Sequence, residues 1–253
     1  MGFEDRTALV VGGSRGLGRA VAMALAREGC HVLAAGRSEK ALRETAMVAE
    51  ARGFRIATAR GDVTREAVAR RLVRAAASGE RRSKSARRGS APDILVHAAG
   101  DYWEGPISAL TPERWEDLVR SNVTSAIHVL RAALPGMRRR RYGRVLLFGV
   151  AGGDAPRATG RAHAYRAAKI ALLTLARSFA IEEAEHGITV NVILPGVIKT
   201  RGTPARWLPS APKIPARRLG SPGEIARAAL FLLAEESGYI TGTALHVSGG
   251  YLL

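Results

Sequence analysis

Tyr165 and Lys169 are the residues in this sequence whose types and spacing most directly suggest chemistry. They lie in "HAYRAAKIAL", an alanine-rich run that predicts a helix. Residues four apart share one face of a helix, so the phenol and the ammonium can reach one site. A nearby ammonium lowers the pKa of a phenol from its usual value of about 10. The pair therefore predicts a proton donor and the cation that tunes it.

A glycine-rich turn near the beginning of the sequence predicts a second functional element. In "VVGGSRGLG", residues 10–18, the glycines follow an apolar run and precede an amphipathic stretch. Glycines permit a tight turn and a close approach of the backbone to a pyrophosphate, which then lies at the N-terminus of the helix. The order strand, turn, helix favours a dinucleotide site. We expect this site to use Gly12, Ser14, Arg15, Gly16, Leu17 and Gly18.

The end of the second apolar run favours NADP(H) over NAD(H). Sites that prefer NAD carry an acidic residue there, about 20 residues after the turn, which holds the ribose 2′-hydroxyl. This sequence has "AAGRS" at residues 34–38 and no acid. We expect Arg37 and Ser38, together with Arg15 from the glycine turn, to contact a 2′-phosphate through charge-assisted hydrogen bonds.

Short apolar runs alternate with amphipathic stretches along the chain and predict the architecture that must position these residues. Strands are expected at 7–13, 31–36, 55–63, 93–100, 144–149, 188–196 and 243–250. Helices are expected at 18–29, 38–53, 64–77, 111–137, 162–186 and 221–236. Such alternation is typical of α/β proteins. We predict a single-domain Rossmann fold over residues 1–253, with a doubly wound, mostly parallel seven-stranded sheet and helices on both faces.

Composition limits the environment of the protein. The chain has 253 residues, of which 47% are hydrophobic, so it is long enough to bury a sizeable core. No apolar run has the length of a membrane span, and the first residues do not have the pattern of a signal peptide. The one cysteine, Cys30, excludes an intramolecular disulfide and is typical of a reducing compartment, so a cytoplasmic location and a buried structural thiol are expected.

The net charge of +17 is concentrated in two arginine-rich clusters, at residues 81–88 and 138–144. Such clusters are either solvated parts of the surface or sites that attract an acidic partner. Neither cluster has interleaved aromatic residues, a zinc pattern or an RNA-binding pattern, so nucleic acid is the less favoured partner. The sequence also has no pattern of metal ligands.

The motifs along the chain resemble those of the short-chain dehydrogenase/reductase family, and in particular its 3-oxoacyl-carrier-protein reductases. They are "GGSRGLG", "GDV", "HAAG", "SNV", "YRAAK", "VNVILPGVIKT" and the closing "GSPGEIARAALFLLAEESGYITGTALHVSGG". They occur in the family's order and cover nearly the whole chain. The resemblance implies that Tyr165 exchanges a proton with the carbonyl or alcohol oxygen, that Lys169 also holds the nicotinamide ribose, and that Asn122 holds a water of the proton relay. It implies that the nucleotide also contacts Asp62, Val63, Ala98, Ala99, Gly100, Tyr165, Lys169, Pro195, Gly196, Ile198 and Thr200.

Three features depart from the family's pattern. Val11 replaces the usual threonine before the first glycine, and His97 with Ala98 replaces a pair of asparagines. We expect His97 to form a structural hydrogen bond across the sheet. The family's catalytic serine is missing: counting back 13 residues from Tyr165 gives Gly152, and aligning the preceding strand gives Gly149. The loop residues Asp154, Thr159 and His163 are the candidates for its role.

The resemblance leaves two function classes open. The first is an NADP(H)-dependent oxidoreductase that reduces a ketone or 3-oxoacyl carbonyl to an alcohol, or runs the reverse reaction. An acyl group on a carrier protein is one candidate substrate. The second is a nucleotide-binding protein with little turnover, acting as a sensor or in a structural role.

The resemblance also predicts an assembly and a substrate loop. A homo-oligomer, most plausibly a tetramer, would pair the helices at about 112–136 and 162–186. The loop at residues 201–219 is expected to cover the substrate, with Trp207, Leu208 and Ile214 as an apolar wall beside Arg206.

Overall fold

Seven strands form one parallel sheet in the order β3-β2-β1-β4-β5-β6-β7. The computed structural model describes residues 2–78, 90–155, 158, 161–203, 207 and 211–253. Every pairing in the sheet is parallel, including those of the two edge strands, so the expected mostly parallel sheet is wholly parallel in the described part. The strands are β1 (Thr7–Val11), β2 (His31–Gly36), β3 (Ile56–Arg60), β4 (Ile94–His97), β5 (Gly143–Phe148), β6 (Ile188–Pro195) and β7 (Ala244–Val247).

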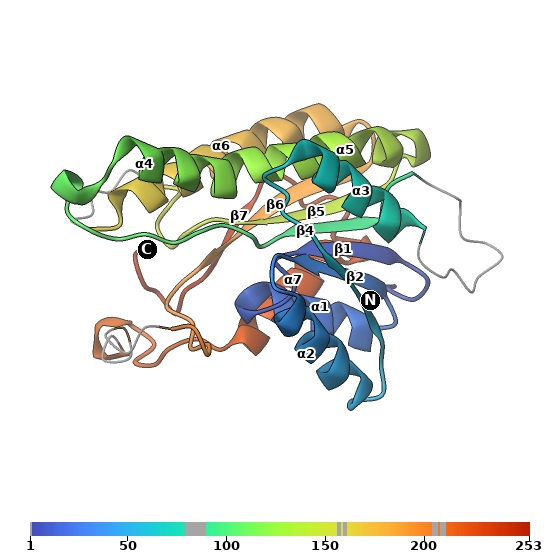
Figure 1. Ribbon diagram of the computed structural model, residues 1–253, viewed down its shortest axis with the longest axis horizontal. Coiled ribbons are helices and arrows are strands. Elements are labelled where there is room, and N and C mark those ends of the chain that lie inside the picture. The colour runs from blue at the N-terminus through green and yellow to red at the C-terminus, as the bar shows by residue number, and fades with distance from the viewer. Residues whose placement is uncertain (1, 79–89, 156–157, 159–160, 204–206, 208–210) are drawn as a thin grey trace.

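Helices cover both faces of the sheet, as predicted for a Rossmann fold (Figure 1). One face carries α3 (Glu66–Ala77), α4 (Pro112–Val119), α5 (Ser125–Arg140) and α6 (His163–Ala184). The other carries α1 (Gly16–Arg27), α2 (Glu39–Glu50) and α7 (Pro222–Leu233). No helix in the described ranges is long and apolar enough to cross a membrane.

The strand sequences explain the two layers. All five residues of β1 are buried, because a parallel sheet covered on both faces excludes water from both. Side chains alternate between the faces. Leu9 and Val11 therefore pack in the core under α3, α5 and α6, while Ala8 and Val10 pack in the core under α1, α2 and α7.

The strand order places a switch point between β1 and β4. From β1 the chain builds outward through β2 and β3, and then returns to add β4 on the other side. Val11 pairs with His97, so both strands end at the same level. Crevices at the carboxyl ends of strands beside such a point are the usual ligand sites of open α/β sheets.

The helix predicted at 111–137 is interrupted. Thr111 caps it as expected, since its side chain accepts a hydrogen bond from the backbone N–H of Arg114, and Pro112 follows. Residues 120–124 then form one π-helical turn between α4 and α5. The expectation of one regular helix was wrong at this point. The wider turn contains Asn122, and single π turns in helices often mark functional positions.

Arginines of the cluster at 138–144 form ion pairs and hydrogen bonds with carboxylates of the same chain. Arg138 forms two hydrogen bonds with the fully buried carboxylate of Glu183. Arg140 is an ion-pair partner of Asp93 at 3.3 Å, and both side chains are about nine-tenths buried. Buried charges need such partners. Much of this cluster is therefore structural. The cluster at 81–88 lies outside the described residues.

Candidate functional site

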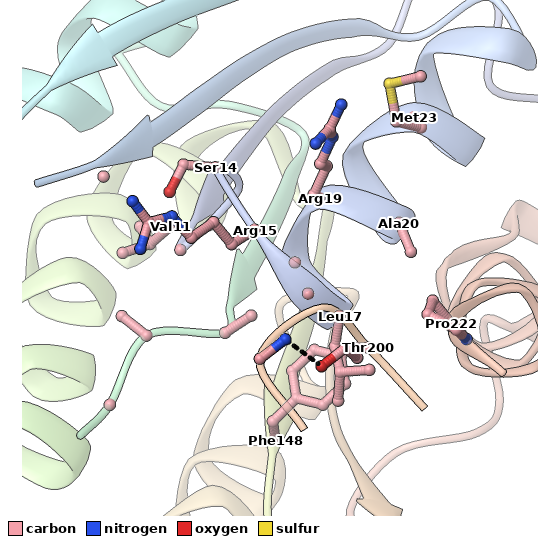
Figure 2. A pocket seen from close by; sticks show the side chains of 18 of the residues that line it. Val11, Ser14, Arg15, Leu17, Arg19, Ala20, Met23, Phe148, Thr200 and Pro222 are labelled. Atoms are coloured by element: carbon pink, nitrogen blue, oxygen red, sulfur yellow. Dashed lines mark hydrogen bonds between the residues drawn. The ribbon is translucent and has the colours of Figure 1, made fainter. Parts of the chain in front are cut away.

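A cavity of about 1690 Å³ lies at the carboxyl ends of the strands, beside the switch point. Figure 2 shows Ser14, Arg15 and Leu17 of the glycine turn on one side of it, with Phe148 and Thr200 below Leu17 in this view. The expected nucleotide residues line it, except Gly196 and Ile198. Those that do are Gly12, Ser14, Arg15, Gly16, Leu17, Gly18, Arg37, Ser38, Asp62, Val63, Ala98, Ala99, Gly100, Tyr165, Lys169, Pro195 and Thr200.

Gly196 and Ile198 lie on the other side of the chain that follows β6. The backbone N–H of Gly196 donates to the carbonyl of Val247, and a Cβ on Gly196 would lie 2.7 Å from Ser248 Cα. Ile198 forms a bridge with Gly220 and packs against the core beneath α7. Both residues thus support the segment that presents Thr200 to the cavity.

The glycine turn needs its glycines for close packing against β4. Gly12 has φ of +80°, and a Cβ there would lie 2.7 Å from the backbone carbonyl of Ala98. On Gly18, a Cβ would lie 2.4 Å from the carbonyl oxygen of Gly12. Gly16 has φ of +53°, yet a Cβ there would meet no atom within 4 Å. Gly12 and Gly18 are therefore needed for packing. Gly16 keeps the cavity wall open where a ligand can approach the backbone.

Two arginines at the β2 end of the cavity are exposed and contact polar neighbours. Arg15 Nη2 donates to Ser38 Oγ at 3.3 Å. Arg37 Nη2 forms an ion pair with Asp101 Oδ1 at 2.8 Å. Their guanidinium groups lie on the cavity lining without a buried carboxylate partner among the described residues, so a phosphate can reach them.

Asp62 follows β3 and is held in a tight turn by Thr64. Its Oδ1 accepts hydrogen bonds from the backbone N–H of Thr64 at 3.0 Å and from Thr64 Oγ1 at 2.8 Å. Partial burial would raise the pKa of Asp62, but these bonds and the charges of Arg37 and Arg65 outweigh it, so the pKa is lowered. The carboxylate is thus a fixed anionic acceptor on the cavity lining.

Tyr165 and Lys169 both face this cavity from the first turns of α6. Lys169 Nζ lies 5.8 Å from the centre of the Tyr165 ring and donates to the carbonyl of Phe148 at 2.9 Å. The Lys169 side chain is buried, and burial lowers its pKa to about 8. The lysine therefore stays mostly protonated at pH 7.

The pKa of Tyr165 departs from the sequence expectation. Burial raises it to about 12, whereas the neighbouring ammonium was expected to lower it. The reason is that loss of water around the phenol disfavours the phenolate, while the Nζ of Lys169 lies 5.8 Å from the ring centre. Tyr165 therefore carries its proton at neutral pH.

Asn122 lies beside the cavity but does not line it. It is fully buried in the π turn, and its Nδ2 donates to the carbonyls of Asp101 at 2.9 Å and Leu118 at 3.0 Å. Its Oδ1 is buried without a hydrogen-bond partner among the described residues. A Cβ on Gly100 would lie only 2.1 Å from that oxygen, so Gly100 makes room for the amide. The oxygen is an acceptor placed directly behind the cavity wall.

His97 bonds to a helix rather than across the sheet. Its Nε2 lies 2.9 Å from Ser125 Oγ, and that hydroxyl donates to the carbonyl of Ser121 at 2.6 Å. Because the hydroxyl proton is used, Nε2–H must be the donor to Ser125. Burial, and then the charge of Lys169, lowers the pKa of His97 to about 3. The ring is therefore neutral and structural, and the expectation of a bond across the sheet was wrong.

Neither glycine proposed for the serine position readily accepts a side chain, although Gly149 lines the cavity. The N–H of Gly149 continues the pairing of β5 with β6 by donating to Ile193, and a Cβ on Gly149 would lie 2.4 Å from Leu194 Cδ2. Gly152 has φ of +63°, which disfavours serine. Arg166 donates to the carbonyls of Ala151 and Gly152 and so holds this turn against α6.

The three loop candidates for the missing role lie in different places. Asp154 Oδ2 bonds to His246 Nε2 on β7 at 2.8 Å, and this hydrogen bond lowers the pKa of Asp154 although partial burial opposes it. His163 begins α6, where its ring contacts Trp103. Thr159 lies outside the described residues. Asp154 is thus engaged at the sheet edge, away from the cavity lining.

The predicted substrate loop is described only in part, and Arg206 and Leu208 fall outside that part. Trp207 contacts the ring of Tyr102. Ile214 is buried beside Gly249 near the C-terminus, where the N–H of Ala216 also donates to the Gly249 carbonyl. The loop is therefore held by the last residues of the chain.

Several lining residues were missed by the sequence analysis. Asp101, Ser121 and Ser125 face the cavity and connect Arg37, Asn122 and His97 to it. The only signal for them was their position, one residue after "HAAG" and within or just after "SNV".

Comparisons with known proteins agree with this geometry over almost the entire chain. The model of the family described as enoyl-(acyl carrier protein) reductase matches residues 11–252. The 3-oxoacyl-[acyl-carrier-protein] reductase FabG of Escherichia coli is 35% identical over 255 residues, covering 99% of this chain and 98% of the relative.

Solved structures give the same result. A 3-oxoacyl (acyl-carrier-protein) reductase from Agrobacterium tumefaciens with NADP bound has a TM-score of 0.85 at 31% identity, covering 99% of this chain and 95% of the other. A blue fluorescent protein from a metagenomic library, in complex with NADPH, has a TM-score of 0.86 at 28% identity, with both chains fully covered. The chain therefore belongs to the short-chain dehydrogenase/reductase family of oxidoreductases.

Proposed function

We propose that this protein reduces a ketone or 3-oxoacyl carbonyl to an alcohol with NADPH, and that Tyr165 donates the proton. The observation that carries the proposal is that one cavity is lined by the glycine turn, by Arg15 and Arg37, and by Tyr165 and Lys169. The reaction adds two hydrogens to a carbonyl: carbonyl, NADPH and a proton give the alcohol and NADP⁺.

The cavity lining fits an NADP(H) cofactor. The backbone at Gly12 and Gly16 and the N-terminus of α1 would hold the pyrophosphate, since Gly16 leaves the turn open. Arg15 and Arg37 would hold the 2′-phosphate, and the relatives with bound NADP or NADPH support this choice. When bound, the cofactor supplies the hydride, and the protein supplies the proton and the orientation.

Tyr165 is suited to the reductive direction. A phenol with a raised pKa holds its proton at pH 7, so it can donate that proton to an oxygen that is gaining negative charge. The ammonium of Lys169, one turn further along α6, would reduce the cost of forming the phenolate and would also hold the nicotinamide ribose. Asn122 Oδ1 offers an acceptor for a water that returns the proton.

The absence of a serine between residues 148 and 165 makes Tyr165 more important. Removing one hydrogen-bond donor to the developing oxyanion costs on the order of 10²–10³ in rate. We propose that turnover is consequently slow on small ketones and depends on how well the rest of the substrate is held.

The absent serine also favours a second candidate function, a nucleotide-binding protein with little turnover. The same segment lacks any serine, and its only threonine is Thr159. The lining of the cavity by both Tyr165 and Lys169 favours the enzyme instead. The two functions are separated by whether any carbonyl compound is reduced.

We propose that the protein forms a homo-oligomer, most plausibly a tetramer. Trp115 on α4 and Ile181 on α6 are large apolar residues with 40% and 81% of their surface exposed, on the helices expected to pair. Light scattering at micromolar concentration tests this, and a monomer would exclude it. An acyl group on a carrier protein remains one candidate form of the substrate, as in the named relatives.

The replacement Tyr165→Phe tests the catalytic proposal. The ring stays while the acid is lost, so we expect kcat to fall by at least 10² and NADPH affinity to stay within twofold. Lys169→Ala should reduce both, because its ammonium has two roles. The proposal fails if Tyr165→Phe turns over at the rate of the unmodified protein.

The replacement Arg37→Asp tests the cofactor. The unmodified protein should bind NADPH at least tenfold more tightly than NADH, and Arg37→Asp should narrow or reverse this ratio, because a carboxylate repels a 2′-phosphate and accepts a 2′-hydroxyl. Equal affinities in the unmodified protein would refute the assignment. Both constants can be measured by the quenching of tryptophan fluorescence.

A further inference from the structure

A series of aromatic rings begins at the proposed proton donor. The ring centres of Tyr102 and Tyr165 lie 5.0 Å apart with an angle of 71° between the planes. Trp207 continues the series, with its ring centre 6.0 Å from that of Tyr102 at 77°. These are edge-to-face contacts in the range that aromatic pairs favour. Tyr165, Tyr102 and Trp207 thus form one continuous aromatic surface that starts at the donor.

A second aromatic contact lies on the same helix turn. Trp103, the neighbour of Tyr102 in the chain, contacts the ring of His163 with the centres 5.6 Å apart at 63°. His163 begins α6, two residues before Tyr165. The four residues Tyr102, Trp103, His163 and Trp207 are named here the aromatic set.

The aromatic set is assembled from distant parts of a chain that has few aromatic residues. Aromatic residues make up only 5% of the sequence, and two of its three tryptophans belong to the set. The rings come from the segment after β4, from the start of α6 and from the loop after β6. Such concentration beside a proton donor is unexpected if these rings only fill the core.

The aromatic set adjoins the cavity at Tyr165 without lining it, and several of its rings are partly exposed. Tyr102 is 40% exposed although it contacts two other rings, and Trp103 and Trp207 are half-buried. The hydroxyl of Tyr102 donates a hydrogen bond to Glu104, so its polar group already has a partner and its ring can contact an apolar ligand. Binding pockets commonly combine such apolar walls with a few placed polar groups.

We propose that the substrate of this site is a carbonyl compound with an aromatic ring attached within a few atoms of the carbonyl, for example an aryl ketone or a 3-aryl-3-oxo ester. This inference rests on the proposed function. The reasoning is geometric: the carbonyl oxygen must reach Tyr165, and the group next to it then lies against Tyr102, whose ring centre is 5.0 Å from that of Tyr165. Edge and face contacts with these rings favour a flat π system over a flexible alkyl chain, which also loses more conformational freedom when it binds.

Two matched substrates test the proposal: ethyl benzoylacetate and ethyl 3-oxohexanoate, which share the 3-oxo ester and differ in the phenyl or propyl group. With NADPH, the unmodified protein should show a kcat/KM at least tenfold higher for the phenyl compound. Tyr102→Leu and Trp207→Leu should each reduce this ratio at least threefold. Tyr239→Leu is the matched control, because Tyr239 is fully exposed and outside the set, and the ratio should not change.

A binding measurement separates failure of this inference from failure of the proposed function. Calorimetry with the NADPH complex of Tyr165→Phe reports the affinity for each ester without turnover. If the unmodified protein reduces neither ester while the phenyl ester still binds more tightly, the proposed function fails and the aromatic preference stands. Equal affinities and equal kcat/KM for the two esters would overturn the inference, as would a ratio that Tyr102→Leu and Trp207→Leu leave unchanged.

Discussion

The glycine turn at residues 12–18 and Tyr165 line the same cavity. The turn and the surroundings of Tyr165 are built from different parts of the chain. The turn is a contiguous stretch whose geometry depends on backbone conformation and on contact with β4. The surroundings of Tyr165 come from four separate parts of the chain, namely residues 101–105, 149–154 and 161–166, and residues 200–203 with Trp207. A local sequence pattern can specify the first region, whereas only the folded chain specifies the second.

This contrast has a functional consequence. All relatives that use the same cofactor need the same phosphate-binding backbone, so the turn is a general device. The segments around Tyr165, the proposed proton donor, would contact the substrate, and such segments can differ between proteins that share a fold. The proposed loss of the serine and the gathering of aromatic rings both fall in the second region.

We expect the largest change in stability within the turn itself, where replacement of two glycines should have different effects. Gly12→Ala places a Cβ 2.7 Å from Ala98 at a positive φ, so we expect it to lower the free energy of unfolding by about 3 kcal/mol. Gly16→Ala has the same kind of φ cost but free space, so it should lose only about 1 kcal/mol while its methyl group weakens NADPH binding at least tenfold. Urea unfolding and nucleotide titration measure the two effects. If Gly16→Ala is the less stable of the two variants, the turn is not built as described.

Gly149→Ser probes the second region. A serine there would raise kcat if the missing hydroxyl alone limited the rate. The Cβ at this position would instead lie 2.4 Å from Leu194, within the core under α6. We therefore expect a loss of about 1–3 kcal/mol of stability from overpacking and no gain in kcat. Gly149→Ala, which adds the Cβ without the hydroxyl, is the control and should lose a similar amount. A tenfold gain in kcat for the serine alone would show that its side chain points into the cavity, whose lining includes Gly149, rather than into the core.

The sequence predicted the fold and most of the nucleotide side because these depend on local patterns. Apolar runs with helical stretches between them specify a parallel sheet, and glycines before a helix specify the phosphate turn. The π turn at Asn122 was not predicted, because a five-residue change in hydrogen bonding leaves no mark on helical periodicity.

Contacts between distant segments could not be predicted from the sequence either. The raised pKa of Tyr165 depends on burial by residues far away in the chain. The bond from His97 to Ser125 and the ion pair of Arg37 with Asp101 join positions 28 and 64 residues apart. Tyr102 and Trp103 gave no signal in the sequence, because their role appears only when their rings meet Tyr165 and His163.

His97 should make the protein less stable in acid. Its pKa is about 3 in the folded state, because of burial, and about 6.5 in an unfolded chain, so the unfolded chain binds the proton more tightly. Stability is therefore complete above pH 6.5 and falls as the pH decreases towards 3. At pH 5 this residue alone should cost about 2 kcal/mol relative to pH 7. His97→Gln should show a flatter dependence of unfolding free energy on pH, and equal slopes in the two proteins would contradict the buried neutral ring.

The smallest effect concerns the ion pair at the border of the two regions. Asp101 follows β4 and holds Arg37, which the proposed cofactor needs for its 2′-phosphate. Asp101→Asn should therefore raise NADPH affinity by about two- to fivefold, the value of an exposed ion pair, and leave NADH affinity unchanged. Asp117→Asn, which breaks an exposed pair with Arg120 outside the cavity lining, is the control and should change neither. An equal rise in the affinities for NADPH and NADH would exclude competition between Asp101 and the 2′-phosphate for Arg37.

The most direct test of the account is the consumption of NADPH by the unmodified protein in the presence of ethyl benzoylacetate. Absorbance at the nicotinamide band follows the cofactor, and chiral chromatography follows the alcohol. If the cavity is a reductase site, NADPH should disappear with saturation kinetics and one alcohol should form for each NADPH consumed. Tight binding of NADPH with no alcohol formed, from this ester or from a broad panel of ketones, would contradict the account and favour a nucleotide-binding protein.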